Sequence, residues 1–330
     1  MTHNTRRRMA LLYAASAVLA VSAAAAALCF GSVPITPTAL FGSADSVQFR
    51  IFALVRIPRM LASLCAGGAL AAAGVIIQNV LHNPLAGPGI IGVNSGALFM
   101  TVLCAAVLPQ LSMLLPLAAF AGALAAMLLV YAAAQRSGAS AYTIVLAGIA
   151  VSAFISAGTD TIAVLYPDTL AGGLSFRTGS LSGITMRALV PAALLIAAAI
   201  AAALMLHNQL DILSLGDETA QSLGLSVRLM RFVFLFLASL LAGSAVSFAG
   251  LMGFVGLIIP HAVRMLAGHQ SLHVLSLSVL WGAAFVAICD TAARTLFAPH
   301  EIPVGIILAF TGGPFFIYLL FKRRGHAPHD

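Results

Sequence analysis

Three arginines stand out because each lies at the edge of a long apolar stretch. Arg56 and Arg59 open the stretch that begins VRIPRMLASLCAGG, and Arg294 lies near the end of another. Arg56 and Arg59 are three positions apart, so on a helix both point to one side, and the proline between them is tolerated in a first helical turn. A guanidinium so placed can pair with an anion. Two interpretations need no partner: an ion pair between Asp290 and Arg294, four positions apart, and arginines that extend to lipid headgroups.

Other catalytic residue types form no recognisable set. The sequence has no G-x-x-x-x-G-K-[ST] phosphate loop, so we expect no nucleotide or cofactor on this chain and ATP with Mg²⁺ only on a partner. His261, His269 and His273 lack a nearby carboxylate or cysteine that would complete a metal site, and the four cysteines are scattered singly through apolar stretches. No nucleophile stands beside a local base, which disfavours an enzyme.

The composition places these residues in a membrane protein. The chain has 330 residues, of which 61 % are hydrophobic and 8 % are charged, too few polar groups to coat a soluble globule. We predict an all-α polytopic fold, one domain over residues 1–330. Each apolar run is long enough to cross the bilayer as a helix. The ten expected spans are 9–30, 58–81, 91–108, 113–134, 142–165, 187–207, 228–249, 253–268, 274–297 and 303–321.

Two of these spans leave an alternative open. The span 253–268 is short and contains Pro260, so a broken or partly re-entrant helix competes with a full crossing. The first span resembles a signal peptide but is longer than the apolar core of one, so we expect it to be retained.

Charge predicts the orientation of the chain. Basic residues flank both the first and the last span, and an even number of spans puts both termini on one side, which the positive-inside rule makes cytoplasmic. Ten Lys or Arg then face inward and six outward, the six including Arg56, Arg59 and Arg294. The positive charge therefore reflects membrane topology, and we expect no nucleic-acid partner.

The polar segment 207–228 lies on the predicted inner side and is too polar to cross the membrane. Ser214 followed by Asp217 has the spacing of a capping box, and Gly224 supplies a helix stop. We expect a short helix at about 214–225, between the sixth and seventh spans, that docks a protein through Leu215 and Leu223. A helix resting on lipid is the alternative, but residues 212–225 contain no Lys or Arg.

The run LHNPLAGPGIIGVNSGAL joins the second and third spans and is rich in Gly, Pro and Asn. Non-helical backbone at membrane depth survives only where protein buries it or water lines it, so Asn83, Pro84 and Leu85 are expected beside a cavity or pathway. A plain cytoplasmic turn is the alternative. Small residues in AGGALAAAG (66–74) and AGLMGFVG (249–256) predict close helix contacts.

Four motifs in order resemble the FecCD-type permease subunits of ATP-binding-cassette (ABC) importers for iron-siderophores, haem and cobalamin. They are the long segment from RIPRM to VNSGA, LGDETAQSLGL, GFVGLIIPHAVRML, and DTAARTLFAPHEIPVGIILAFTGGPFFIYLL. The resemblance implies a type II importer fold, a second permease subunit that makes a homodimer or a heterodimer, two cytoplasmic ATPases and an extracytoplasmic binding protein. It also implies a bacterial cytoplasmic membrane and an iron chelate as cargo, with a ferric siderophore first and haem or cobalamin behind it.

The resemblance also assigns residues. Arg56, Arg59 and Arg294 are expected to meet glutamates of the binding protein. The segment that couples to the ATPase would comprise Ser214, Leu215, Gly216, Asp217, Glu218, Thr219, Ala220, Leu223 and Gly224. The inner gate would comprise Asn83, Pro84 and Leu85 together with Ser140, Ala141 and Tyr142, the last three from the loop SGASAYT, which matches the family poorly. The competing hypothesis is an ion-gradient-driven transporter, for which Asp160 and Asp290 are the only acids within the spans.

Overall fold

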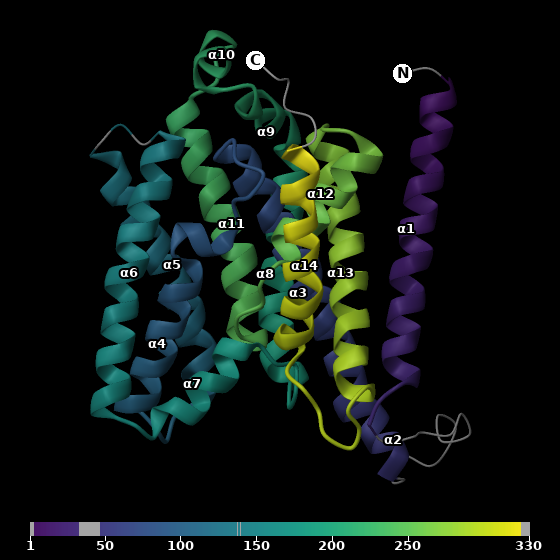
Figure 1. Ribbon diagram of the computed structural model, residues 1–330, viewed down its shortest axis with the longest axis vertical. Helices are drawn as coiled ribbons and strands as arrows, with labels where there is room; N and C mark the ends of the chain where they lie inside the picture. Colours follow the sequence, from purple (N-terminus) through teal and green to yellow (C-terminus); the bar gives the residue numbers. More distant parts are fainter. Residues whose placement is uncertain (1–2, 33–46, 137, 139, 325–330) are drawn as a thin grey trace.

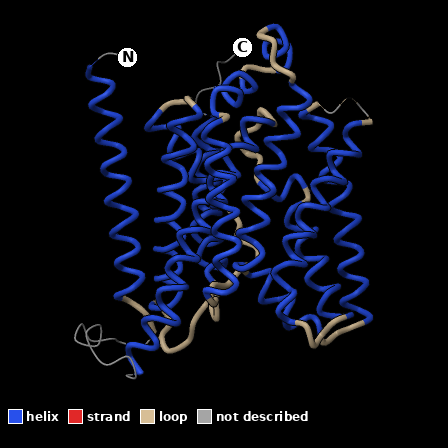
Figure 2. Tube along the Cα trace, turned by 180° about the vertical axis from the view of Figure 1, so that it is seen from behind, coloured by secondary structure: helices blue, strands red, loops and turns tan. Residues whose placement is uncertain are grey.

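The computed structural model describes residues 3–32, 47–136, 138 and 140–324. Over these residues the chain forms helices and connecting loops without a strand (Figure 2). Seven of the described helical segments are long and apolar enough to cross a membrane, and three shorter apolar helices complete the ten that were expected. The ten are α1 (His3–Cys29), α3 (Ile57–Val80), α4 (Val93–Val107), α5 (Leu115–Gln135), α6 (Ala141–Leu165), α8 (Met186–Met205), α11 (Val227–Ala249), α12 (Val255–Ala267), α13 (Ser271–Thr295) and α14 (Val304–Arg324).

The short elements lie at the two ends of the bundle (Figure 1). At one end are α9 (His207–Ser214) and α10 (Asp217–Ser222), near the start of α1 and the end of α14. At the other end are α2 (Val47–Ile51) and α7 (Thr169–Thr178). We call these the α10 end and the α2 end. Both chain termini are therefore on the same side of the bundle, as an even number of crossings requires.

Helix α3 forms the centre of the fold. Buried residues make up 78 % of the most apolar stretch of Val47–Val80 but only 11 % of that of Ala141–Leu165, so α3 is surrounded by other helices whereas α6 is peripheral. A Cβ atom on Gly67 would lie 2.0 Å from the carbonyl oxygen of Gly282, and one on Gly74 would lie 2.0 Å from that of Gly256. The backbones touch because neither partner carries a side chain there, which confirms the close contacts predicted from the small residues.

The eighth crossing is only partly helical. Helix α12 has 13 residues, about 20 Å at 1.5 Å per residue, and is shorter than a hydrocarbon core of about 30 Å. Residues 250–254 before it are non-helical, and Phe254 has a positive φ of 66°. The Leu251 amide donates to the Phe176 carbonyl at 2.8 Å, and the Ser180 amide donates to Ala249 at 2.9 Å. Irregular backbone is thus bonded within the protein, as the broken-helix alternative expected.

The second crossing begins earlier than the sequence indicated. A π-helical turn, Phe52–Arg56, joins α2 directly to α3, so the helical segment runs from Val47 to Val80. Pro58 follows this turn, where its ring would collide with the carbonyl four residues earlier in a regular helix. The wider turn relieves that collision.

Candidate functional site

A cluster of buried charges lies at the α2 end, where α3, α13 and the loop 296–303 meet. The Arg59 Nε donates to both carboxylate oxygens of Asp290, at 3.1 and 3.0 Å, and Nη2 donates to the same carboxylate at 3.0 Å. The Arg59 Nη1 donates to Glu301 at 2.7 Å. Asp290 is 1 % exposed and Arg59 is 5 % exposed, so the ion pair between these two residues is shielded from solvent. A multidentate arginine of this kind fixes the geometry of both partners.

The other two arginines connect the cluster to α1. The Arg294 Nε lies 3.2 Å from the Asp290 carboxylate, and Nη2 donates to the Ala27 carbonyl at 3.1 Å. The Arg56 Nη1 donates to the carbonyls of Leu28 and Cys29, the second at 2.8 Å. These carbonyls end α1, where the negative end of the helix dipole favours a cation. The arginine cluster, defined as Arg56, Arg59, Asp290, Arg294 and Glu301, therefore joins α1, α3 and α13.

Glu301 was not predicted as a functional residue. It is the sole acid in the loop 296–303, and its Oε1 also accepts from the Ser32 hydroxyl at 3.1 Å. Partial burial raises the pKa of the Glu301 carboxyl, but the hydrogen bond and the charge of Arg59 outweigh it, so this pKa lies below its ordinary value of 4.5. The sequence could have pointed to Glu301 because it lies in a loop next to a helix end that carries an arginine. The spacing of loop residues, however, does not indicate which side chains they contact.

The arginine cluster tests the two interpretations that need no partner protein, an internal ion pair and contact with lipid headgroups. The internal ion pair of Asp290 with Arg294 is confirmed. The headgroup interpretation is wrong, because Arg56, Arg59 and Arg294 are 4 %, 5 % and 4 % exposed and their guanidinium groups bond within the protein. Docking to a binding protein is not tested by this geometry and stays a prediction.

At the α10 end, the predicted capping box is wrong. The Ser214 hydroxyl donates to the Asp211 carbonyl at 2.7 Å and ends α9, so it is not free to cap the following helix. Helix α10 begins at Asp217, after Gly216, which has a positive φ of 101°. The helix expected at 214–225 is therefore shorter, at residues 217–222, and it is separated from α9 at Gly216, since only a residue without a Cβ takes that turn without strain.

Helix α10 has one buried face and one exposed face. Ala220 is fully buried, whereas Leu215 and Leu223 are each 60 % exposed. Asp217 forms an ion pair with Arg231 on α11. Gly224 has φ 81°, and the Leu225 amide donates to the Ala220 carbonyl at 3.0 Å, so the predicted stop at Gly224 is confirmed. Glu218 and Thr219 are exposed, so α10 and the two leucines that flank it present an acid and apolar side chains outward.

The segment 81–92 lies against α9. The His82 Nε2 lies 2.8 Å from the Leu213 carbonyl, which links the segment to the α10 end. The Asn83 side-chain oxygen accepts from the Leu85 amide at 2.9 Å and holds a local turn around the half-buried Pro84. Leu85 is 40 % exposed. The start of segment 81–92 is therefore held by its own turn and by the bond to α9.

The second gate segment is covered in part, since Ser137 and Ala139 lie outside the described residues. Ser140 caps α6, accepting from the Thr143 amide at 3.2 Å, with Ala141 half-buried and Tyr142 73 % exposed behind it. Helix α6 contacts segment 81–92 near the end of that segment, where a Cβ on Gly148 would be 1.8 Å from the Ile90 carbonyl oxygen. The structure thus packs α6 closely against the end of segment 81–92, at Ile90.

A second polar network was missed at this end. Arg264 on α12 donates to the side-chain oxygens of Gln78 and Asn79, the latter at 3.1 Å, and the Gln78 amide donates to the Gly256 carbonyl at 2.8 Å. Asp211 accepts from the Ser271 amide at 2.8 Å and so joins α9 to the start of α13. The bonded partners are 186, 185 and 60 positions apart in sequence, so no local spacing relates them.

Among the described residues no group of three or more His, Cys, Asp or Glu is placed to hold a metal ion. Within the same part of the chain, the His273 Nδ1 lies 3.0 Å from the Tyr13 hydroxyl, so that imidazole binds α1 to α13. Asp160 is exposed on α6, and Asp290 is enclosed by arginines. The two acids within the spans therefore lie in different surroundings. None of the four ion pairs among the described residues involves Asp160, so these pairs give no sign of a proton relay between the two acids.

Comparisons with known proteins agree with this organisation. Residues 16–322 match the model of the FecCD transport family. The Fe(3+)-citrate import system permease protein YfmE of Bacillus subtilis is 35 % identical over 98 % of both chains, and the hemin transport system permease protein HmuU of Yersinia pestis is 34 % identical over 86 % of both. A solved inward-facing metal-chelate type ABC transporter is 30 % identical, with a TM-score of 0.85 over 94 % of this chain and 99 % of that one. The chain therefore belongs to the FecCD transport family.

Proposed function

We propose that this chain is the permease subunit of an ABC importer that carries an iron chelate across a bacterial cytoplasmic membrane. The observation that carries the proposal is the separation of two unlike polar regions: the arginine cluster is at the α2 end, and the exposed α10 is at the opposite end (Figure 1). A subunit that links an outer delivery protein to an inner energy source needs both.

The proposal sets the direction of the chain and its partners. The α10 end, with both termini, faces the cytoplasm, where two ATPase subunits bind ATP and Mg²⁺. A second permease subunit, identical or related, completes the pathway. Alternating access follows if closure of the ATPases moves α10 and the neighbouring segment 81–92, to which α9 is bonded through His82.

Helix α10 suits contact with an ATPase. Leu215 and Leu223 would enter an apolar cleft of the partner, and Glu218 would lie at its rim. The ion pair of Asp217 with Arg231 ties α10 to α11, so a push on α10 reaches a helix that packs on α3. Coupling would thus pass through a short, rigid path.

Docking of the binding protein at the α2 end would require a rearrangement, because the three arginines already have partners. Glu301 is the partner best placed to be exchanged: its side chain is 31 % exposed and lies in a loop, whereas that of Asp290 is 1 % exposed within α13. A glutamate of the binding protein would then replace Glu301 on Arg59, which keeps the number of charge pairs constant.

The cargo is proposed from the relatives. Those compared above are named for ferric citrate and hemin, and others similar in identity are named for siderophores and cobalamin. A ferric siderophore is the first choice, with haem and cobalamin as alternatives. We assign the choice among these chelates to the binding protein.

Uptake by the reconstituted importer tests the proposal. The permease, its ATPase and its binding protein are placed in liposomes, and entry of a labelled ferric chelate is followed with ATP inside and with an imposed proton gradient. We expect uptake with ATP alone, and none with the gradient when the ATPase carries an inactivated catalytic site. Uptake that follows the gradient and ignores the ATPase would identify a secondary transporter instead.

A further inference from the structure

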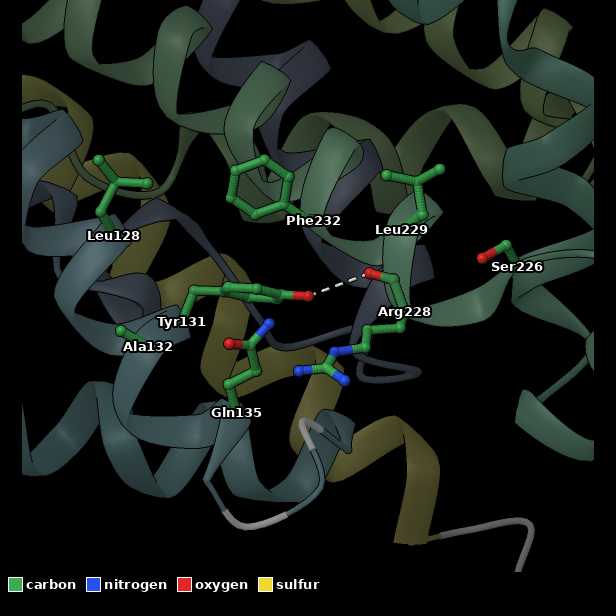
Figure 3. Close-up of a pocket in the computed structure, with 8 residues that line it drawn as sticks. All are labelled: Leu128, Tyr131, Ala132, Gln135, Ser226, Arg228, Leu229 and Phe232. Atoms are coloured by element: carbon green, nitrogen blue, oxygen red, sulfur yellow. Dashed lines mark hydrogen bonds between the residues drawn. The ribbon is translucent and has the colours of Figure 1, made fainter.

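A cleft opens between the end of α5 and the start of α11 (Figure 3). Its volume is about 600 Å³. Helix α5 contributes Leu128, Tyr131 and Gln135, which are spaced at three and four residues and so share one face. Helix α11 contributes Arg228, Leu229 and Phe232. Neither the arginine cluster nor α10 uses these side chains.

Most of the cleft is apolar. The rings of Tyr131 and Phe232 lie with their centroids 5.0 Å apart, and Tyr131 is 7 % exposed, so together they form the floor. The Tyr131 hydroxyl donates to the Arg228 carbonyl at 3.0 Å, which satisfies its polar end (Figure 3). Leu128 and Leu229 border the opening and are 44 % and 54 % exposed. Such a border suits hydrocarbon better than water.

One end of the cleft carries a cation. Arg228 is exposed and takes part in none of the four ion pairs among the described residues. With its oxygen turned toward Arg228, the Gln135 amide accepts from Nε at 3.3 Å and from Nη2 at 2.9 Å. Gln135 thereby holds the guanidinium in place without neutralising it. Other N–H groups of the guanidinium stay available to an anion, and phosphate oxygens match its fork geometry.

The cleft lies at the α10 end. Arg231, less than one helical turn beyond Arg228, forms the ion pair with Asp217 of α10. In the membrane orientation proposed above, this is the depth of the inner-leaflet headgroups, where anionic phospholipids concentrate. An apolar slot with a cation at its headgroup end fits an amphiphile with a negative headgroup, whereas a soluble anion would use only the cation.

We propose that this cleft binds an anionic phospholipid, with an acyl chain over Tyr131 and Phe232 and the phosphate on Arg228. The bound lipid would stabilise the first turns of α11, on which α10 is held. The inference rests on the proposed membrane orientation and not on the identity of the cargo.

Native mass spectrometry of the purified permease–ATPase complex tests this site. The complex is titrated with phosphatidylglycerol or with phosphatidylcholine of the same acyl chains, and glycerol phosphate is added as the free headgroup. We expect phosphatidylglycerol to bind about tenfold more tightly than phosphatidylcholine. Glycerol phosphate at equal concentration should not displace it. Equal binding of the two lipids, or displacement by glycerol phosphate, would overturn the proposal; the second result would identify a site for a free anion.

Substitution of Arg228 tests whether this residue causes the preference for phosphatidylglycerol. Arg228→Gln should remove the preference for phosphatidylglycerol, and Arg228→Lys should keep most of it. Arg187→Gln is the matched control, because Arg187 is also exposed and is also the second residue of a crossing helix, α8, at the opposite end. A preference that survives Arg228→Gln, or that is lost equally in Arg187→Gln, would contradict the site. ATP-driven uptake, measured separately, tests the transport function and not this cleft.

Discussion

The arginine cluster and the α10 segment, residues 214–225, differ in whether their charged side chains are buried or exposed. At the α2 end Arg59, Asp290 and Arg294 are almost fully buried and bonded to one another. At the α10 end two leucines of the α10 segment are 60 % exposed, and Glu218 is also exposed. The first region is complete within the chain, whereas the second presents groups that a partner would cover. A docking surface at the α2 end must therefore be opened, and one at the α10 end already exists.

The largest expected effect is the loss of Asp290. The variant Asp290→Ala leaves Arg59 and Arg294 buried without their shared carboxylate, and breaking a buried pair costs about 3–5 kcal/mol. Thermal unfolding of the purified subunit in detergent measures the loss of stability. Asp160→Ala is the control, since Asp160 is an exposed acid on α6, and it should change stability by less than about 0.5 kcal/mol. Equal stability of the two variants would show that the cluster does not hold the fold.

The second effect concerns docking at the α2 end. Replacing Arg56 and Arg59 by Glu should weaken binding of the delivery protein by about 30-fold or more at low salt, because a glutamate of that protein would meet negative charge in place of Arg59. The change also places a carboxylate beside the buried Asp290, so thermal unfolding is measured first and docking is compared for subunit that folds. The difference from wild type should shrink as salt rises. Binding to the subunit in nanodiscs is the measurement. Arg187→Glu, at the same end but outside the cluster, should bind nearly as wild type. Unchanged docking of the double variant at low salt would refute the role.

The third effect concerns coupling at the α10 end. Replacing Asp217 and Glu218 by Lys removes the ion pair with Arg231 and reverses the charge at the start of α10. We expect the number of cargo molecules taken up per ATP hydrolysed to fall about tenfold, because movement of the ATPase would no longer be passed to α11. Uptake and phosphate release are measured together in liposomes. Because the same change leaves the buried Arg231 without its carboxylate, thermal unfolding is measured alongside, and the coupling ratio is compared for subunit that folds. Normal coupled turnover would count against α10 as the coupling element.

The smallest effect is the pH dependence that Glu301 adds. Its folded pKa is lowered, so its pairing with Arg59 contributes stability above the unfolded value of 4.5 and loses that contribution as the pH falls through the folded pKa. The stabilities of wild type and Glu301→Gln should therefore change in parallel between pH 8 and 5. Below pH 4.5 wild type should lose stability faster than the variant. Unfolding midpoints at pH 5, 4 and 3 measure this, and parallel curves over the acid range would contradict it.

The sequence predicted what depends on composition and near neighbours. The ten helices follow from runs of apolar residues, the close contacts of Gly67 and Gly74 from small side chains, and the pair of Asp290 with Arg294 from a spacing of four. It did not predict the bond of Arg59 to Asp290, which are 231 positions apart. Such pairing depends on which helices become neighbours, and apolar periodicity alone does not fix that.

Local irregularities were also beyond the sequence pattern. The π-helical turn before Pro58 and the split of α9 from α10 at Gly216 depend on how the backbone meets its neighbours. Ser214 has the spacing of a cap, yet it bonds back to Asp211 because α9 continues to that residue. A capping motif shows which hydrogen bonds a side chain could make, and the structure of the preceding segment determines which of them forms.

Sidedness is the most direct test of the account. In a chain whose four cysteines are replaced, single cysteines at Thr219 on α10 and at His300 in the loop 296–303 are treated with a membrane-impermeant thiol reagent on intact spheroplasts. The account predicts labelling of position 300 from outside and of position 219 only after the membrane is opened. Labelling of both positions from one side would contradict it.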